Sequence, residues 1–377
     1  MVADTAVIRV VHIVTRTNIG GVSNYLLHLI QGTTKEVEST VIRGSASEEE
    51  GDYFAQHEIP AVVLNVPELR RNSSPFGDLL ALIRVVKILR QLRPDIVHTH
   101  MAKAGVVGRL AALIAGTPIR IHTFHGHLLY GYFGKIASSA VILVERCLRR
   151  VTTHVIVNGE RVRQDLIQLG VITALRSSMI PPAVNQSAPR DSGTQRLLFG
   201  LPMEQFVVGF IGRLATIKRP DRVVELAKRL PEVHFAIFGD GPLRTQLESS
   251  AKTQRNVSFH GWVREASLAL AAVDALVLTS DNEAVAIVLI EAAQARVPVC
   301  AMDVGSVSEI VLDGETGLLA SDLDSLEVGI RRLISNPDER LQMASSAAEL
   351  ANLLYTRERL VAAHLHLYSA LLGRQSS

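Results

Sequence analysis

Residues 279–298, TSDNEAVAIVLIEAAQARVP, decide the fold of the second half of this chain. They follow a short apolar run, ALVL at 275–278, that is typical of a buried strand. A polar turn then leads into an alanine-rich pattern that predicts a helix. The step from strand through turn to helix is the unit from which parallel α/β sheets are built.

Two glutamates, Glu283 and Glu291, stand eight positions apart in this stretch. If the helix begins near Ala284, its first amides have no partner within the helix and favour an anion such as a diphosphate. The rise of a helix separates the two carboxylates by roughly 12 Å, so they could hold hydroxyl groups on opposite sides of that diphosphate. A sugar nucleotide has this layout. The pattern also fits a first-turn dipole partner at Glu283 and a solvated helix residue at Glu291.

Five further motifs follow one another along the chain. They are GGVSN at 20–24, TFHGH at 123–127, GFIGRLATIKRPD at 209–221, FGDGPL at 238–243 and VGSVSEIVLDGETGLL at 304–319. With the paired glutamates, this ordered set resembles the family 4 retaining glycosyltransferases of the GT-B fold. The resemblance implies an α/β protein with two Rossmann-like doubly wound parallel-sheet domains that face each other across a cleft.

The domains are expected at 1–185 for the acceptor and at 206–355 for the nucleotide sugar. Residues 186–205, rich in Gln, Ser, Pro and Gly, are expected to be a linker, and 356–377 a helix that crosses back to the first domain.

The resemblance also implies roles for individual residues. Arg213 and Lys218 would stabilise the departing nucleoside diphosphate, while Glu283 and His125 would orient the sugar and Glu291 would hold the ribose. Further contacts to the donor nucleotide are expected from Gly20, Gly21, Gly239, Gly241, Trp262, Val263, Ala286 and Ile287. A glycine pair such as the one at 20–21 also occurs in ordinary tight turns between a strand and a helix.

The chain departs from the family pattern beside the first glutamate. Ala284 stands where the family has a glycine, and Ser306 follows Gly305 where a second glycine is common. No protein-bound cofactor is expected beyond the donor substrate, for which a UDP-sugar is the prediction. No Asp-x-Asp metal motif is apparent, which favours a metal-independent reaction.

Composition places the chain among globular proteins able to bury large cores, with 377 residues, 47% hydrophobic and 20% charged. Cys147 and Cys300 lie far apart in apolar contexts, so we expect buried thiols and no disulfide. Neither a signal peptide nor an apolar run long enough to span a membrane is indicated, which predicts a cytoplasmic protein.

Charge is divided unevenly along the chain. Residues 1–190 hold 21 Lys and Arg against 14 Asp and Glu, or +7, and the remainder holds 18 against 23, or −5. A basic first half suits an anionic partner such as a lipid diphosphate, and no nucleic acid is expected. Contact of this basic half with the inner face of a membrane is a hypothesis, and the helix expected at 136–150 is its candidate, although that helix also fits packing on the core. The basic residues of the helix expected at 78–93 indicate a solvated face.

Histidines cluster at expected strand ends, where α/β sheets bind ligands. His98 and His100 have no acid or cysteine at metal-ligand spacing, so packing or a polar contact is favoured over a metal. The function predicted is transfer of a hexose or N-acetylhexosamine from a nucleotide sugar to a lipid-linked or saccharide acceptor. The alternatives are a GT-B epimerase acting on UDP-N-acetylglucosamine and a catalytically inactive nucleotide-binding relative. A Rossmann dehydrogenase is disfavoured because no GxGxxG follows the first strand.

Overall fold

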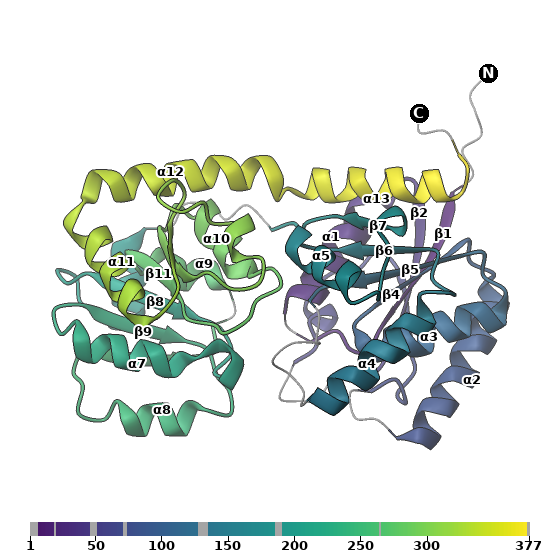
Figure 1. Cartoon of the computed structure of the whole chain (residues 1–377), viewed down its shortest axis with the longest axis horizontal. Coiled ribbons are helices and arrows are strands. Elements are labelled where there is room, and N and C mark those ends of the chain that lie inside the picture. The colour runs from purple at the N-terminus through teal and green to yellow at the C-terminus, as the bar shows by residue number, and fades with distance from the viewer. Residues whose placement is uncertain are drawn as a thin grey trace. The chain divides into compact units, whose positions relative to one another are not determined.

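The computed structural model describes residues 7–18, 20–45, 51–70, 74–126, 135–184, 191–263 and 265–374, which form two compact units. Unit 1 contains the described residues up to 183 together with 357–374, and unit 2 contains those from 184 to 356. Figure 1 shows each unit as a sheet with helices on both faces. The structure confirms the predicted α/β class and the doubly wound parallel sheet in each half.

Unit 1 has a seven-stranded sheet in the order β3-β2-β1-β4-β5-β6-β7, with every neighbouring pair parallel. Its strands are β1 (Ile8–Val14), β2 (Val37–Arg43), β3 (Val62–Asn65), β4 (Ile96–His100), β5 (Ile119–Phe124), β6 (His154–Val157) and β7 (Ser177–Met179). Its helices are α1 (Gly21–Gly32), η2 (Phe54–Gln56), α2 (Pro75–Leu92), α3 (Ala102–Ala115), α4 (Lys135–Leu148), α5 (Glu160–Gln168), η3 (Ala174–Arg176) and α13 (Arg357–Leu371).

Unit 2 has a six-stranded sheet in the order β10-β9-β8-β11-β12-β13, again with parallel pairs. Its strands are β8 (Val207–Ile211), β9 (His234–Phe238), β10 (Val257–Gly261), β11 (Ala275–Leu278), β12 (Val299–Met302) and β13 (Leu318–Ala320). Its helices are α6 (Ser192–Phe199), η4 (Thr216–Lys218), α7 (Pro220–Arg229), α8 (Arg244–Ser250), α9 (Ala266–Ala271), α10 (Ile287–Gln294), η5 (Val307–Glu309), α11 (Leu323–Ser335) and α12 (Pro337–Leu354).

Each sheet is covered on both faces, which is why central strands such as β4 and β11 are buried at every residue rather than at alternate ones. In unit 1, α1 and α13 cover one face and α2 and α3 the other, each pair enclosing its own hydrophobic cluster. In unit 2, α9, α10 and α12 pack on one face, and α7, α8 and α11 on the other. Because the helices hold both faces of the sheets, the loops at the carboxyl ends of the strands are left to carry ligand groups.

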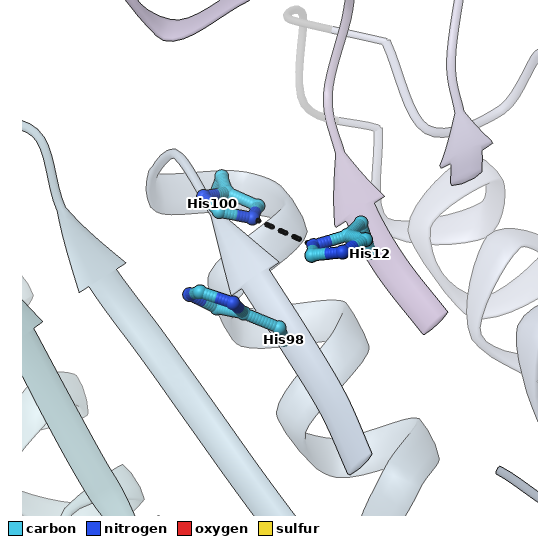
Figure 2. Close-up of side chains that lie close together, drawn as sticks. All are labelled: His12, His98 and His100. Carbon is cyan, nitrogen blue, oxygen red and sulfur yellow. Dashed lines mark hydrogen bonds between the residues drawn. The ribbon is translucent and has the colours of Figure 1, made fainter. Parts of the chain in front are cut away.

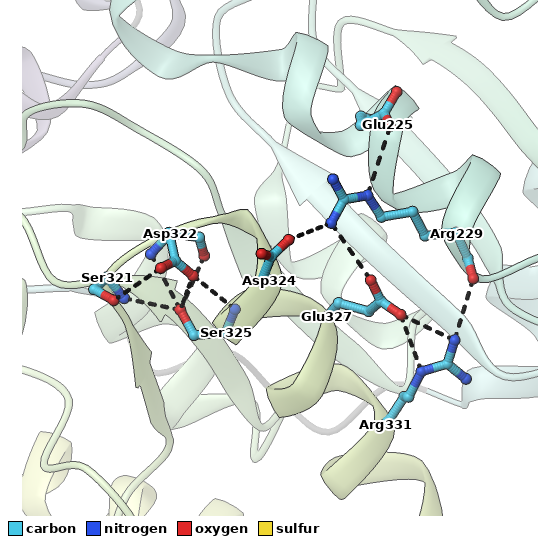
Figure 3. A network of polar contacts seen from close by, with 8 residues as sticks. All are labelled: Glu225, Arg229, Ser321, Asp322, Asp324, Ser325, Glu327 and Arg331. Atoms are coloured by element: carbon cyan, nitrogen blue, oxygen red, sulfur yellow. Dashed lines mark hydrogen bonds and ion pairs between the residues drawn. The ribbon is translucent and has the colours of Figure 1, made fainter.

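Charged side chains join α7 to α11 on the surface of unit 2 (Figure 3). Arg229 pairs with Asp324 at 2.6 Å, and Arg331 pairs with Glu327 at 3.0 Å. Asp322 caps α11 by accepting from the amide of Ser325 at 2.8 Å. Asp322 and Asp324 have the spacing of an Asp-x-Asp motif, but their side chains serve this cap and this ion pair.

The structure corrects the predicted start of the helix in the deciding stretch. Helix α10 begins at Ile287 with Ala286 as its N-cap, three residues later than expected. The preceding loop bonds to its neighbours instead, because the amide of Asp281 donates to Ile217 O at 2.9 Å. The carbonyl of Glu283 accepts from the amide of Ser306 at 3.2 Å, so the loop is fixed in a non-helical path.

The predicted linker is also corrected, because most of its described part belongs to unit 2. Residues 186–190 lie outside the described residues, and α6 follows directly, capped by Asp191. Arg196 of α6 pairs with Asp274 at 2.5 Å, and Leu201 is buried in the core of unit 2. Polar residues on either side of 192–199 made this segment resemble a linker, so its amphipathic helix was not predicted.

The helix expected at 136–150 is α4. Glu145 is buried and forms a two-pronged ion pair with Arg109 at 2.8 Å, whereas Leu143 is 62% exposed. Helix α4 therefore packs one face only.

Cys147 lies on the exposed side, contrary to prediction, while Cys300 is buried as expected. In the part of the chain that is described, no helix is long and apolar enough to span a bilayer.

Candidate active site

The strand order of unit 2 reverses between β8 and β11, which are neighbours in the sheet. Strands β9 and β10 lie beyond β8, while β12 and β13 lie beyond β11. At such a switch point, the loops after the two central strands diverge and leave room for a ligand. Here these loops span 212–219 and 279–286, which hold three of the four predicted catalytic residues.

An ion pair joins the two loops. The Nζ of Lys218 lies 2.5 Å from Oε1 of Glu283, and the hydroxyl of Ser280 donates to the same oxygen at 2.6 Å. Thr279 donates from its hydroxyl to the carbonyl of Lys218 at 2.9 Å. Glu283 is 7% exposed and Lys218 is 31% exposed, so the ammonium group is the more accessible partner. The fold thus brings together two residues that the sequence separates by 65 positions.

Arg213 follows β8 directly and is exposed. Within the described ranges, its guanidinium has no acidic or carbonyl partner. The nearby Arg219 and Arg222 instead pair with Asp281, at 3.3 Å and 2.8 Å. Of these three arginines beside the switch point, Arg213 therefore has its donors available for an anionic ligand.

Gly239 and Gly241 lie in the loop after β9, which packs against the loop after β8. A Cβ at Gly239 would lie 1.9 Å from Gly212 O, and one at Gly241 would lie 2.5 Å from Leu214 O. Both also have positive φ, 138° and 157°. The protein's own backbone therefore requires glycine at both positions, and the expected contact with the nucleotide stays a prediction.

Glu291 lies on α10, one helical turn beyond the first residues, Ala286 and Ile287, that were predicted to meet the donor. Burial raises the pKa of the Glu291 carboxyl to about 7. No described side chain or amide bonds to it. No side chain caps α10 at Ala286, so the first-turn amides are open to a ligand. A half-buried carboxyl without a described partner is a group that a ribose hydroxyl could satisfy.

Trp262 and Val263 follow β10 at the edge of the sheet. Trp262 is 54% exposed, whereas Val263 packs against the core beside β9. An exposed indole at the carboxyl edge is available to a flat ring, and the proposed contact with the base remains a prediction.

Sequence reasoning missed two positions in this unit. Ser280 bonds to Glu283, and its place three residues before the acid was the available signal. Gly305 packs so closely that a Cβ would lie 1.6 Å from Glu283 O, at φ 56°. The loop after β12 therefore supports the backbone that carries Glu283.

In unit 1, the sheet order reverses between β1 and β4. Gly20 precedes α1 with φ 157°, and a Cβ there would meet only Asn18 Nδ2, at 3.8 Å. Space beside Gly20 is thus open, as expected of a helix start near a ligand. Gly21 is the first residue of α1, and no side chain caps that helix. Contact between this pair and a donor remains a prediction.

Three buried imidazoles stand at the same edge of unit 1: His12 on β1, and His98 and His100 on β4 (Figure 2). Their nearest nitrogens lie within 4.8 Å of one another, a spacing that also suits a metal ion. Both nitrogens of His98 are already engaged, with Tyr368 Oη at 2.7 Å and Thr123 Oγ1 at 2.6 Å. This supports the predicted packing role over a metal site, because a ligand nitrogen must have a free lone pair.

His125 follows β5 and lies beside this cluster. Its Nε2 is 3.0 Å from His100 Nδ1, and its Nδ1 is 3.2 Å from Nδ2 of Asn158. Burial lowers the pKa of His125 to about 3, so the ring is neutral. The sequence indicated one of these partners, His100, only as a member of a strand-end pair with His98. The other partner, Asn158, was missed.

Two family models match the chain and together span most of it. The model for Glycosyltransferase Family 4 matches residues 19–188, and that for Glycosyl transferases group 1 matches residues 194–350. The chain belongs to glycosyltransferase family 4. The switch-point site in unit 2 therefore lies in a glycosyltransferase.

Relatives of known activity agree with this family. The UDP-Gal:α-D-GlcNAc-diphosphoundecaprenol α-1,3-galactosyltransferase of Escherichia coli is 28% identical over 295 residues, 73% of this chain and 75% of the relative. The α-D-kanosaminyltransferase of Streptomyces kanamyceticus is 26% identical over 303 residues, 74% of this chain and 78% of the relative.

Solved structures share the fold of this family 4 chain. HepE from Anabaena, in complex with UDP and glucose, matches with a TM-score of 0.84 at 22% identity, covering 96% of this chain and 100% of HepE. Sucrose-phosphate synthase from Thermosynechococcus elongatus matches with a TM-score of 0.83 at 19% identity, covering 97% of this chain and 99% of that one. These likenesses confirm the predicted GT-B fold.

Proposed function

We propose that the protein is a retaining glycosyltransferase that moves a hexose or N-acetylhexosamine from a UDP-linked donor to a hydroxyl group of a lipid-linked or saccharide acceptor. The observation that carries this proposal is the Lys218–Glu283 ion pair at the switch point of unit 2. It sets a cation and a hydroxyl acceptor beside the uncapped start of α10. A diphosphate joined to a sugar needs both kinds of group.

Arg213 and Lys218 are proposed to stabilise the leaving nucleoside diphosphate. Negative charge grows on the bridging phosphate oxygen as the glycosidic bond breaks, and fixed cations favour that state over the intact donor. The exposed guanidinium of Arg213 and the accessible ammonium of Lys218 are supplied by the same loop. This pair supports a reaction that does not depend on a metal ion.

Glu283 and Glu291 are proposed to hold hydroxyl groups on either side of that diphosphate. Glu283 already accepts from Ser280 and Lys218, and its second oxygen would accept from the transferred sugar. Glu291 would accept from the ribose, which would give its half-buried carboxyl a partner that the described residues do not supply. The expected contact of His125 with the sugar stays a prediction, as does that of Trp262 with the base.

The donor and acceptor classes are proposed from the relatives. The E. coli relative acts with UDP-Gal on a lipid-linked diphosphate saccharide, by its name. The excess of basic residues in the first half of this chain supports an anionic acceptor of that kind.

A membrane contact is proposed for one surface of unit 1, formed by α2 and the end of α3. Phe76, Leu79 and Ile83 are 79%, 55% and 56% exposed and recur along one side of α2. An open apolar groove continues from Ile83 between the two helices, with Lys87 and Arg90 on its rim. Apolar side chains beside cations match the surface of an anionic bilayer.

This surface can be tested with lipid vesicles. The wild type should sediment with vesicles that contain phosphatidylglycerol, less with phosphatidylcholine alone, and less at high salt. A variant with Phe76→Ser and Ile83→Ser together should lose most of this binding and keep its Tm. Equal binding by both proteins would contradict the contact.

Two alternatives remain within the same fold. An epimerase acting on UDP-N-acetylglucosamine would turn its substrate over without an acceptor. An inactive relative would bind a nucleotide and transfer nothing, and Ala284 beside the first glutamate is the feature that favours it. Incubation with UDP-sugars, with and without a lipid-linked acceptor, separates the three by their products.

The first experiment is binding of UDP, GDP, ADP, UDP-glucose and UDP-N-acetylglucosamine by calorimetry. We expect micromolar binding of uridine nucleotides that weakens at least tenfold in Arg213→Ala and Glu291→Ala. Arg331→Ala is the matched control, because it removes an exposed arginine that pairs with Glu327 on α11. No binding by the wild type, or equal losses in the control, would refute the proposed site. The anomeric configuration of the product, read by NMR, tests retention.

A further inference from the structure

A hydrogen-bonded chain of four buried or partly buried side chains crosses unit 1 at the carboxyl end of its sheet. Asn158 Nδ2 lies 3.2 Å from His125 Nδ1, and His125 Nε2 lies 3.0 Å from His100 Nδ1. His100 Nε2 in turn lies 3.4 Å from His12 Nδ1, the contact drawn in Figure 2. The chain follows four adjacent strands, because β6, β5, β4 and β1 are consecutive in the sheet.

A chain of neutral imidazoles has a direction, since each ring has one N–H donor and one acceptor nitrogen. The amide group of Asn158 donates to Nδ1 of His125, so the proton of that ring lies on Nε2. Nε2 of His125 then donates to Nδ1 of His100. His100 donates from its own Nε2 to His12, and every bond in the chain runs the same way.

A second directed chain holds the neighbouring groups and ties α13 to the sheet. Nδ1 of His364 donates to Leu360 O at 2.8 Å, so its Nε2 accepts from the hydroxyl of Tyr25 at 2.9 Å. The hydroxyl of Thr123 is hydrogen-bonded to Tyr25 and to Nε2 of His98, and Nδ1 of His98 is hydrogen-bonded to Tyr368. His98 therefore belongs to this second hydrogen-bonded chain, and His100 to the first.

The ring of His125 is held by packing as well as by hydrogen bonds. Tyr25 meets it edge to face, with ring centres 4.8 Å apart. The titratable groups that surround it are His12 on β1, Tyr25 on α1, His98 and His100 on β4, His122 on β5, and His364 on α13. Among the described residues, no carboxylate belongs to this set, so none of these rings would gain a counter-ion by taking up a proton.

We propose that Asn158 and His100 are positioning residues that hold His125 as a neutral imidazole with its proton on Nε2. This inference rests on the proposed function, in which His125 lies by the transferred sugar. Positive charge develops on a sugar ring as its bond to the leaving group breaks. A neutral ring fixed in place would let that charge form, whereas an imidazolium would oppose it.

The tautomer can be read directly in the protein without substrate. Long-range proton–nitrogen NMR on histidine-labelled protein identifies which ring nitrogen is protonated, with His125→Gln used to assign the signal. We expect the Nε2–H form at His125 from pH 5 to 8 in the wild type. In Asn158→Asp, the carboxylate accepts instead of donating, so the proton should move to Nδ1 and the pKa of His125 should rise.

Kinetics then separate positioning from a purely structural role. Asn158→Asp should lower kcat about tenfold or more at pH 6, with donor KM within a few-fold of the wild type. Its activity should recover as the pH rises, because the histidine becomes neutral again. His100→Gln should lower kcat at every pH without adding a new ionisation.

His122→Gln is the matched control. His122 lies on the same strand that precedes His125, is fully buried, and bonds to Thr99 outside the chain. This variant is expected to lose stability while the tautomer of His125 and the pH profile remain those of the wild type.

Four results would overturn the inference. They are an Nδ1–H signal at His125 in the wild type, an unchanged tautomer in Asn158→Asp, a wild-type kcat and pH profile in Asn158→Ala, and one metal ion per purified chain. Should Asn158→Asp fail to fold, the wild-type spectrum and the His100→Gln kinetics still decide. If the protein transfers no sugar, the proposed function fails while the NMR result stands by itself.

Discussion

Lowering the pH from about 7.5 to about 5.5 should destabilise unit 1 by at least about 4 kcal/mol. The perturbation acts on histidines that are buried in neutral form. Burial lowers the pKa of His12 and His125 to about 3 and that of His364 to about 4. In the unfolded chain each returns to about 6.5, so below that pH the unfolded state binds protons that the folded state does not.

The magnitude follows from that difference. Each of the three histidines contributes about 1.4 kcal/mol over the two pH units from about 7.5 to about 5.5, most of it below the unfolded pKa of about 6.5. The contribution to stability is therefore complete above pH about 6.5 and is lost as the pH falls towards the folded pKa values. His98 and His100 shift in the same direction and add to the loss.

The assay must distinguish the two units. Trp262 is the only tryptophan of the chain, so its fluorescence in urea follows unit 2. Hydrogen exchange of peptides from β1 and β4, measured at matched chemical exchange, follows unit 1. We expect the exchange of these unit 1 peptides to report a loss of at least about 4 kcal/mol. Replacing His364 with Gln should reduce the number of protons that unit 1 takes up on unfolding by about one, and so flatten the pH dependence of its free energy of unfolding. Equal stability of unit 1 at both pH values would refute the reasoning.

Three further predictions concern unit 2 and the thiols. UDP should bind several-fold more tightly at pH 8 than at pH 6, because the pKa of Glu291 is raised to about 7 and only the carboxylate form accepts hydrogen bonds from two hydroxyl groups. Calorimetry of Glu291→Gln should show weaker binding that does not change with pH. Gly239→Ala should lower the free energy of urea unfolding by about 3 kcal/mol or more, since its Cβ would lie 1.9 Å from a carbonyl oxygen. Gly314→Ala, at a glycine with positive φ but open space around it, should lower it by about 1 kcal/mol. Similar losses in the two variants would contradict the steric argument. A thiol reagent should modify exposed Cys147 in the native protein and reach Cys300 only in denaturant, and native labelling of both would show that Cys300 is accessible.

Local signals were sufficient for the class of fold. Apolar runs such as 275–278 are buried strands, and the helices after them follow from capping and periodicity that any short window contains. The ordered motifs also located the loops of the switch point in unit 2, because these loops must follow particular strands. Two predictions were wrong, the start of α10 and a linker where α6 lies at 192–199, since both segments are fixed by bonds to distant parts of the chain.

The sequence by itself determined which residue types are present at the ends of the strands: an arginine and a lysine after β8, a glutamate after β11, and a histidine after β5. Only the tertiary structure decided their partners. Lys218 meets Glu283 because β8 and β11 are neighbours in the sheet, although the two residues are 65 positions apart in the chain. His125 is neutral because four strands and α13 bury it among rings without a carboxylate, and burial, unlike residue order, is a property of the folded whole.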